Sequence, residues 1–203
     1  MIKFVSICPH PPILLPSIGS DESALKLKNT IKSLNYLNKK FKKINPNSII
    51  ISSPHPDWGF NVPLYFLAKN FKGEIKTYLT GSENPEYYFK QGQEFYLKED
   101  KDYALIASGD LSHCLKKDGP YGFNSDGPKF DKALLKYLEK RDIKNILKLD
   151  KMFPQASECG LRSFCFILGI LETAKLDWKI RVLSYEKPFG VGYLVADILI
   201  FNH

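Results

Sequence analysis

The sequence predicts an α/β fold in which a central, mostly buried and mixed sheet is flanked by helices on both faces. Three observations lead to this prediction. Short apolar segments rich in β-branched residues alternate with amphipathic segments of helical period along most of the 203 residues. One helical segment late in the chain is apolar nearly all round, as expected of an interior helix. The last two strands are separated by a short turn containing glycine, which favours an antiparallel pair.

The expected strands are short, apolar and bounded by proline, glycine or polar residues. The first strand ends at Pro9, because proline supplies no backbone N–H. The second contains the run from Ile49 to Ile51, which is typical of a strand buried on both faces. We expect strands at residues 2–7, 48–52, 75–79, 103–107, 180–185 and 192–201.

The expected helices carry apolar residues at helical spacing. Ser20 or Asp21 is the expected N-cap of the longest one. Ser157 is the expected N-cap of the apolar interior helix, which would then begin at Glu158. We expect helices at residues 22–43, 85–97, 129–140, 143–149 and 158–175, and loops at 115–128 and 151–157.

Size and charge restrict the class of protein. A chain of 203 residues that is 44% hydrophobic can bury a sizeable core, and we expect residues 1–203 to form one domain. The net charge of +7 raises the question of nucleic-acid binding. The densest lysines, between Lys26 and Lys43, lie on a predicted helix without interleaved aromatic residues. A solvated helix face is therefore favoured over a nucleic-acid partner.

Composition also bears on the compartment. No apolar run approaches the ~20 residues of a membrane-spanning helix, and the first apolar segment is interrupted by Pro9 before it reaches signal-peptide length. None of the four cysteines forms a C-x-x-C pair, so a zinc ribbon or a thioredoxin-type site is not expected. We therefore expect a reduced, cytoplasmic chain without a membrane partner.

Three of the four histidines share one position relative to the expected strands, and His203 is the last residue of the chain. His10, His55 and His113 each follow the end of a predicted buried strand. Ligands of open α/β sheets bind outside such carboxyl ends, so parallel neighbouring strands would bring the three imidazoles together. Flanking prolines hold His10 and His55 on stiff, extended segments, as suits metal ligands, whereas His113 ends a turn and can serve another purpose.

Glu158 is the candidate anionic ligand. A carboxylate at the start of a buried helix is explained either by the helix dipole and Arg162 four residues later, or by a metal. Two histidines and one carboxylate form the facial set typical of non-haem Fe(II). His113 would then be free to act as an acid and base, since its ordinary pKa lies near neutrality.

Five motifs together resemble the class III extradiol ring-cleavage dioxygenase superfamily, of the catalytic B-subunit type. They are "CPHPPILLP", "SPHPDWG", "SGDLSH", "ECGLRS" and "YEKPFGVGYLVA", in this order over nearly the whole chain. The nearest branch resembles the short proteins grouped with Memo and the AmmeMemoRadiSam system. The resemblance implies an α/β core and an Fe(II) ion bound by His10, His55 and Glu158, with His113 as the acid–base catalyst.

The resemblance also implies an oxidoreductase that acts with O₂ on a small aromatic, diol or phenolic substrate, and it allows a homo-oligomer. Asp110, three residues before His113, is a candidate to orient its ring, although capping a turn explains it equally well. In Memo-type relatives a cysteine takes part in the metal site, and Cys159 is adjacent to Glu158. A carboxylate favours iron, and a thiolate would favour another ion such as Zn or Cu. Our preference is Glu158, because Cys159 would point about 100° further round the predicted helix.

Two alternative functions use the same cluster. A Memo-like protein would bind a metal and work with a radical enzyme without cleaving rings. A metal-dependent hydrolase would activate water and would turn over esters or phosphates without O₂.

Overall fold

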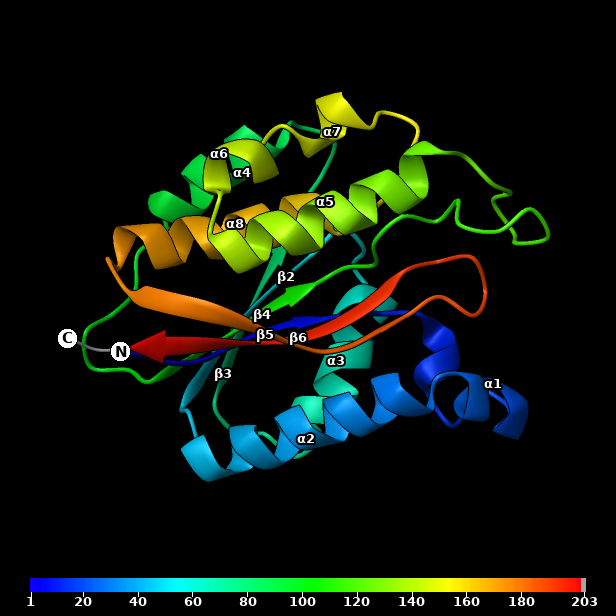
Figure 1. The fold of residues 1–203 in the computed structure, drawn as a ribbon. Helices are drawn as coiled ribbons and strands as arrows, with labels where there is room; N and C mark the ends of the chain where they lie inside the picture. Colours follow the sequence, from blue (N-terminus) through cyan, green and yellow to red (C-terminus); the bar gives the residue numbers. More distant parts are fainter. Residues whose placement is uncertain (202–203) are drawn as a thin grey trace.

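Six strands form one mixed sheet between two layers of helices, as Figure 1 shows for the computed structural model, which describes residues 1–201. The α/β prediction is confirmed. His203 lies outside the described residues. Within them, no helix is both long and apolar enough to cross a membrane.

The elements alternate along the chain in the way the hydrophobic pattern predicts. The strands are β1 (Ile2–Cys8), β2 (Ser48–Ser53), β3 (Glu74–Leu79), β4 (Tyr103–Ser108), β5 (Asp177–Glu186) and β6 (Tyr193–Phe201). The helices are the 3₁₀ turn η1 (Pro12–Leu14) and α1 (Asp21–Lys26), α2 (Lys28–Ile44), α3 (Trp58–Ala68), α4 (Pro85–Gln93), α5 (Asp126–Lys140), α6 (Ile143–Ile146), α7 (Leu149–Met152) and α8 (Leu161–Thr173).

The strand order β3-β2-β4-β1-β6-β5 divides the sheet into a parallel and an antiparallel part. β1, β2, β3 and β4 are parallel, so their carboxyl ends meet at one edge. β6 runs antiparallel to β1, and β5 antiparallel to β6, which confirms the expected antiparallel pair. The start of β1 and the end of β6 lie at the opposite edge from the carboxyl ends of the parallel strands (Figure 1).

Each face of the sheet packs against its own layer of helices. α4, α5 and α8 cover one face, and α2 and α3 cover the other (Figure 1). On the first face the rings of Tyr78 and Phe166 stack, with centroids 3.8 Å apart. The central strands β1, β2 and β4 are almost completely buried as a result.

An ion cluster around one buried carboxylate ties the second layer to the antiparallel strands. Asp197 of β6 has no exposed surface and accepts hydrogen bonds of 2.6 Å from both Lys40 of α2 and Arg181 of β5. A fully buried carboxylate requires such partners, because an unpaired charge away from water is costly.

The helices differ from the sequence-based expectation in several places. The helix expected at 143–149 is two short helices, α6 and α7, the second of which extends into the loop expected at 151–157, and α4 ends at Gln93 and not at residue 97. The first long helix is broken at Leu27, whose φ and ψ of −110° and 22° separate α1 from α2. The segment 58–68 forms α3, although the sequence analysis assigned no helix there; Pro63 lies inside it and its mostly buried side chains give no amphipathic pattern. The interior helix begins at Leu161 and not at Glu158, because Ser157 has a left-handed φ of 53° that turns the chain.

Candidate metal centre

The three histidines that follow strand ends lie at one edge of the sheet. β2, β4 and β1 are consecutive parallel neighbours. His10, His55 and His113 come two, two and five residues after the ends of β1, β2 and β4. The rings of His10 and His55 approach edge to face, with centroids 5.2 Å apart. The order of the parallel strands therefore brings the histidines together, as the sequence analysis predicted.

His10 is held at three points and is almost fully buried, with 2% of its surface exposed. Its backbone N–H donates to Asp110 Oδ1 over 3.0 Å, and its Nδ1 lies 3.0 Å from Ser108 Oγ. Its Nε2 lies 3.4 Å from Cys159 Sγ. Burial, and then the neighbouring His55, lower the pKa of His10 to about 3, so the ring is neutral, as a metal ligand must be.

His55 is more accessible than His10. Its backbone N–H donates to Ser53 Oγ over 3.1 Å, which fixes the loop just after β2. The indole of Trp58, at the start of α3, lies beside it with ring centroids 5.2 Å apart, and 42% of Trp58 is exposed. The ring of His55 therefore contacts both a buried histidine and a partly exposed aromatic ring.

Asp110 and Cys159 complete the cluster and contact each other. The Asp110 N–H donates to Cys159 Sγ over 3.3 Å, and Asp110 Oδ2 lies 3.9 Å from His10 Nε2. Burial raises the pKa of Asp110 to about 6, despite the opposing effects of the His10 N–H and the nearby histidines. Burial, followed by the charge of Asp110, raises the pKa of the Cys159 thiol. Binding a metal through Cys159 would therefore release a proton.

A pair of glycines lets the segment before α8 reach the sheet. A Cβ on Gly109 would lie 2.2 Å from the Cα of Gly160, so a side chain at this position cannot be accommodated without moving backbone. Because the two backbone segments lie this close, the Gly160 N–H can donate to the Asp110 carbonyl over 3.0 Å. Cys159, one residue earlier, is carried to His10 by this contact.

The donor atoms form two overlapping groups. His10, His55 and Cys159 have ligand atoms within 4.8 Å of one another, and so do Asp110, His113 and Cys159. Imidazole nitrogens and a thiolate are ligands that suit Zn, Cu and Fe, and a carboxylate extends the set toward harder ions. The donor chemistry of this edge therefore fits a transition metal.

Glu158 belongs to neither of these groups. Its Oε2 accepts from the Leu161 N–H over 2.7 Å, and its Oε1 accepts from Arg162 over 3.1 Å. Burial raises the pKa of Glu158, and these two contacts oppose that rise. In this arrangement Glu158 satisfies the first turn of α8 and pairs with Arg162, which is the structural role weighed in the sequence analysis.

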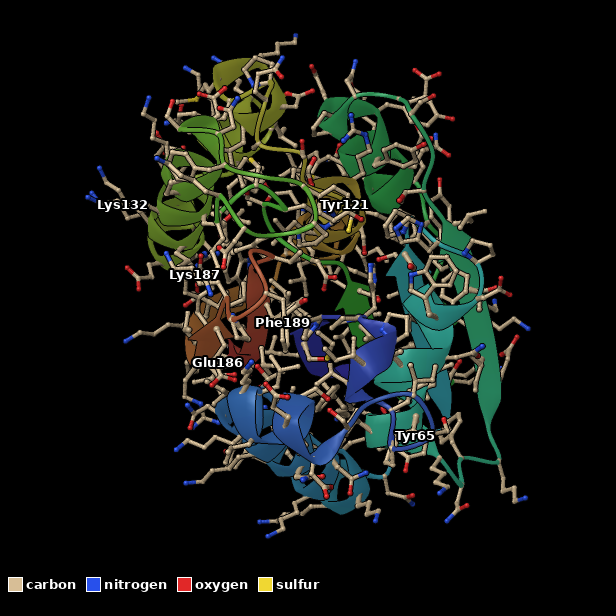
Figure 2. All side chains as sticks on the ribbon, turned by 90° about the vertical axis from the view of Figure 1, so that its right-hand side faces the viewer. Tyr65, Tyr121, Lys132, Glu186, Lys187 and Phe189 are labelled. Atoms are coloured by element: carbon tan, nitrogen blue, oxygen red, sulfur yellow. The ribbon has the colours of Figure 1, made fainter. Side chains whose placement is uncertain are left out.

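The loop after β4 places His113 in the second donor group, with Asp110 and Cys159. His113 Nε2 is buried and has no hydrogen-bond partner within residues 1–201, and burial lowers the pKa of the ring. The ring of Tyr121, itself 62% exposed, lies against it with centroids 5.0 Å apart. Figure 2 views this edge of the sheet, with Tyr121 near the middle of the face and Phe189 below it.

A buried aspartate fixes the backbone just before His113. Asp131 of α5 accepts from the Ser112 N–H over 2.9 Å through Oδ1 and from the Tyr185 hydroxyl through Oδ2. Only 2% of Asp131 is exposed, and burial raises its pKa to about 6, against the effects of these two donors and of Lys187. Asp131 thus ties α5 and β5 to the loop that carries His113.

The sequence analysis named the residues that meet here but not all of their roles. It treated Cys159 as secondary to Glu158, since both were expected on one helix. It also missed Ser108, Tyr121 and Trp58. Ser108 could have been suspected as the last residue of a strand that ends at the site. Trp58 begins α3, the helix that the sequence analysis did not assign, and Tyr121 lies in a loop whose course the sequence does not reveal.

A large groove lies away from the histidines. It has a volume of about 860 Å³, runs between α2 and α3 and ends near η1, and none of His10, His55 or His113 lines it. The groove is lined by side chains such as Ile31, Asn38 and Tyr65. Volume therefore does not identify the chemical site of this chain.

Comparison with known proteins identifies the family to which this chain belongs. Protein CA_C1420 of Clostridium acetobutylicum is 32% identical over 97% of this chain, and the chain spans 57% of the length of that relative. The crystal structure of the uncharacterized protein JW3007 from Escherichia coli K12 has the same fold, with a TM-score of 0.64 and 13% identity over 97% of this chain and 99% of that one. The model of one family matches residues 52–196, which include His55, His113 and Cys159. This chain belongs to the family of the catalytic LigB subunit of aromatic ring-opening dioxygenase.

Proposed function

We propose that this chain is a metal-dependent oxidoreductase that acts with O₂ on a small diol or phenolic compound. The observation that carries the proposal is the meeting of His10, His55 and Cys159 within 4.8 Å at the edge of the sheet, with His113 beside them. Membership of the dioxygenase family supports the same reaction class.

The donors that could hold the metal are His10, His55 and Cys159. Fe(II) is the ion that the sequence analysis favours, and Zn or Cu are the alternatives that a thiolate admits. A bound ferrous ion would supply adjoining coordination positions for a diol and for O₂. Glu158, the ligand predicted from sequence, would have to leave both Leu161 and Arg162 to take part.

His113 is the residue proposed to move protons. Its Nε2 has no partner within the described chain, so it is available to a substrate hydroxyl. Because burial lowers the pKa of the ring, His113 is neutral near pH 7 and can accept the first proton. Trp58 and Tyr121 offer two partly exposed ring faces beside His55 and His113, which suits a planar substrate.

Metal content tests the ligand set. The protein would be purified without O₂, and its bound metals measured for the wild type and for His10→Ala, His55→Ala, Cys159→Ala and Glu158→Gln. We expect the first three to lose most of the bound metal and Glu158→Gln to retain it. If Glu158→Gln loses the metal and Cys159→Ala keeps it, the carboxylate is the third ligand, as the sequence suggested. Retention by both histidine variants would refute the site.

Oxygen uptake with a panel of catechols tests the reaction. We expect uptake that needs the metal and that falls sharply in His113→Ala, with metal content unchanged. A single observation favours a second candidate function, a Memo-like metal protein that works with a radical enzyme: Cys159, and not Glu158, has its ligand atom among those of the two histidines, and the resemblance to Memo-type proteins implies a cysteine in the metal site. No uptake across the panel, together with copurification of a radical enzyme, would decide for this second function.

A further inference from the structure

We infer that Ser108 is a positioning residue that fixes the tautomer of His10, and that Pro63 makes this possible by leaving one helix carbonyl free. The inference rests on the proposed function, because it concerns which His10 nitrogen is presented to a metal. It assigns a role to two residues that contribute no ligand atom to the donor groups.

The chain of contacts begins in α3. In an α-helix the N–H of residue i+4 bonds to the carbonyl of residue i. The partner of the Gly59 carbonyl would be the N–H of residue 63, but this residue is Pro63, which has none. Gly59 is buried, and an unpaired buried carbonyl is costly. The Ser108 hydroxyl donates to this carbonyl and satisfies it.

That bond determines how Ser108 meets His10. A serine hydroxyl has one proton, and a carbonyl can only accept, so the proton of Ser108 Oγ points to Gly59. The remaining lone pairs of Oγ face His10 Nδ1 at 3.0 Å, so Nδ1 must carry the proton and donate. Neutral His10 is then protonated on Nδ1 and keeps its lone pair on Nε2.

The surroundings of Nε2 agree with this assignment. Cys159 Sγ lies 3.4 Å away and can donate its thiol proton to a lone pair there. Asp110 Oδ2 would favour a proton on Nε2, but at 3.9 Å it is beyond hydrogen-bond distance, whereas Ser108 is within it. The Nε2 lone pair thus faces Cys159, where the proposed metal would bind, and Ser108 prepares the ring before any ion arrives.

The chain provides a matched control in Ser52. Ser52 lies on β2, pairs with Ala107 in the neighbouring strand, and is as fully buried as Ser108. Its hydroxyl also bonds to a helix, through Ser163 of α8, and within residues 1–201 it has no hydrogen bond to a histidine. Ser52→Ala and Ser108→Ala should therefore shift the urea midpoint of unfolding similarly, and any difference in metal binding reports on His10.

Two measurements test the inference. Long-range ¹H–¹⁵N NMR of the metal-free protein should show His10 protonated on Nδ1 in the wild type and in Ser52→Ala, and a mixture of tautomers in Ser108→Ala. Titration with Co²⁺ without O₂ should show about 10–100-fold weaker binding for Ser108→Ala, and less than about 3-fold for Ser52→Ala.

The inference is overturned if His10 stays protonated on Nδ1 alone in Ser108→Ala, or if the two serine variants bind Co²⁺ equally well. Failure of the proposed function has a different signature. In that case wild-type protein itself does not bind Co²⁺, while the NMR comparison still decides the role of Ser108.

Discussion

Replacing Asp131 by asparagine should change how stability depends on pH. Asp131 is buried and accepts from the Ser112 N–H and the Tyr185 hydroxyl. An asparagine keeps one carbonyl oxygen for Ser112, and the Tyr185 hydroxyl can turn to accept from the new amide. The substitution therefore removes an ionisable group while leaving the hydrogen bonds largely in place.

The direction follows from the pKa of Asp131, which burial raises from 3.8 to about 6 in the folded protein. The folded state thus prefers the neutral acid. This contribution to stability is fully present below pH 3.8 and is lost as the pH rises through 6. A rise of this size corresponds to about 3 kcal/mol in all, of which about 2 kcal/mol falls between pH 4.5 and 7.5.

Urea unfolding of the wild type and Asp131→Asn, at matched ionic strength between pH 4.5 and 7.5, measures this effect. The other titratable groups are the same in both proteins, so their effects cancel in the difference between the two free energies of unfolding. We expect the wild type to lose about 2 kcal/mol relative to the variant over this range. A difference that stays constant with pH, or that changes in favour of the wild type as the pH rises, would show that burial does not raise this pKa.

Three further substitutions test the packing around the site and the sheet. Gly109→Ala should abolish metal binding and destabilise the fold by at least 2 kcal/mol, roughly, because its Cβ would meet the backbone of Gly160. Metal content and urea unfolding would check this, and normal values for both would contradict the close approach. Asp197→Asn should cost about 2 kcal/mol, since it weakens the charge-assisted hydrogen bonds from Lys40 and Arg181, which are themselves partly exposed to water. A loss below about 0.5 kcal/mol in urea would refute that role. Phe166→Ala should cost about 3–5 kcal/mol through the cavity that it leaves beside Tyr78, and a thermal midpoint near that of the wild type would count against this packing.

The histidines could be predicted from sequence because their positions depend on strand ends alone. A buried strand is recognisable from its run of β-branched residues, and parallel strands bring their carboxyl ends to one edge. His10 and His55 could thus be placed together without knowledge of any loop. The strand boundaries at Cys8 and Ser53 agree with the predicted ones to within one residue.

The position of Cys159 could not be predicted, because it depends on one backbone angle. Ser157 has the composition of a helix cap, yet its φ of 53° reverses the chain and delays α8 until Leu161. Cys159 therefore lies in a loop, where the geometry of a helix does not apply, and the 100° argument that favoured Glu158 fails. The close contact of Gly109 with Gly160 was equally invisible, because glycine has no side chain to leave a pattern.

The separation of the donors along the chain has a consequence for biosynthesis. His10 precedes Cys159 by 149 residues, which a ribosome needs roughly 7–30 s to add. Over that interval the nascent protein has His10, and later His55, but lacks the thiol of Cys159. With the ligand set proposed above, all three donors can bind an ion only after Cys159 has been added and the Gly109–Gly160 contact has formed.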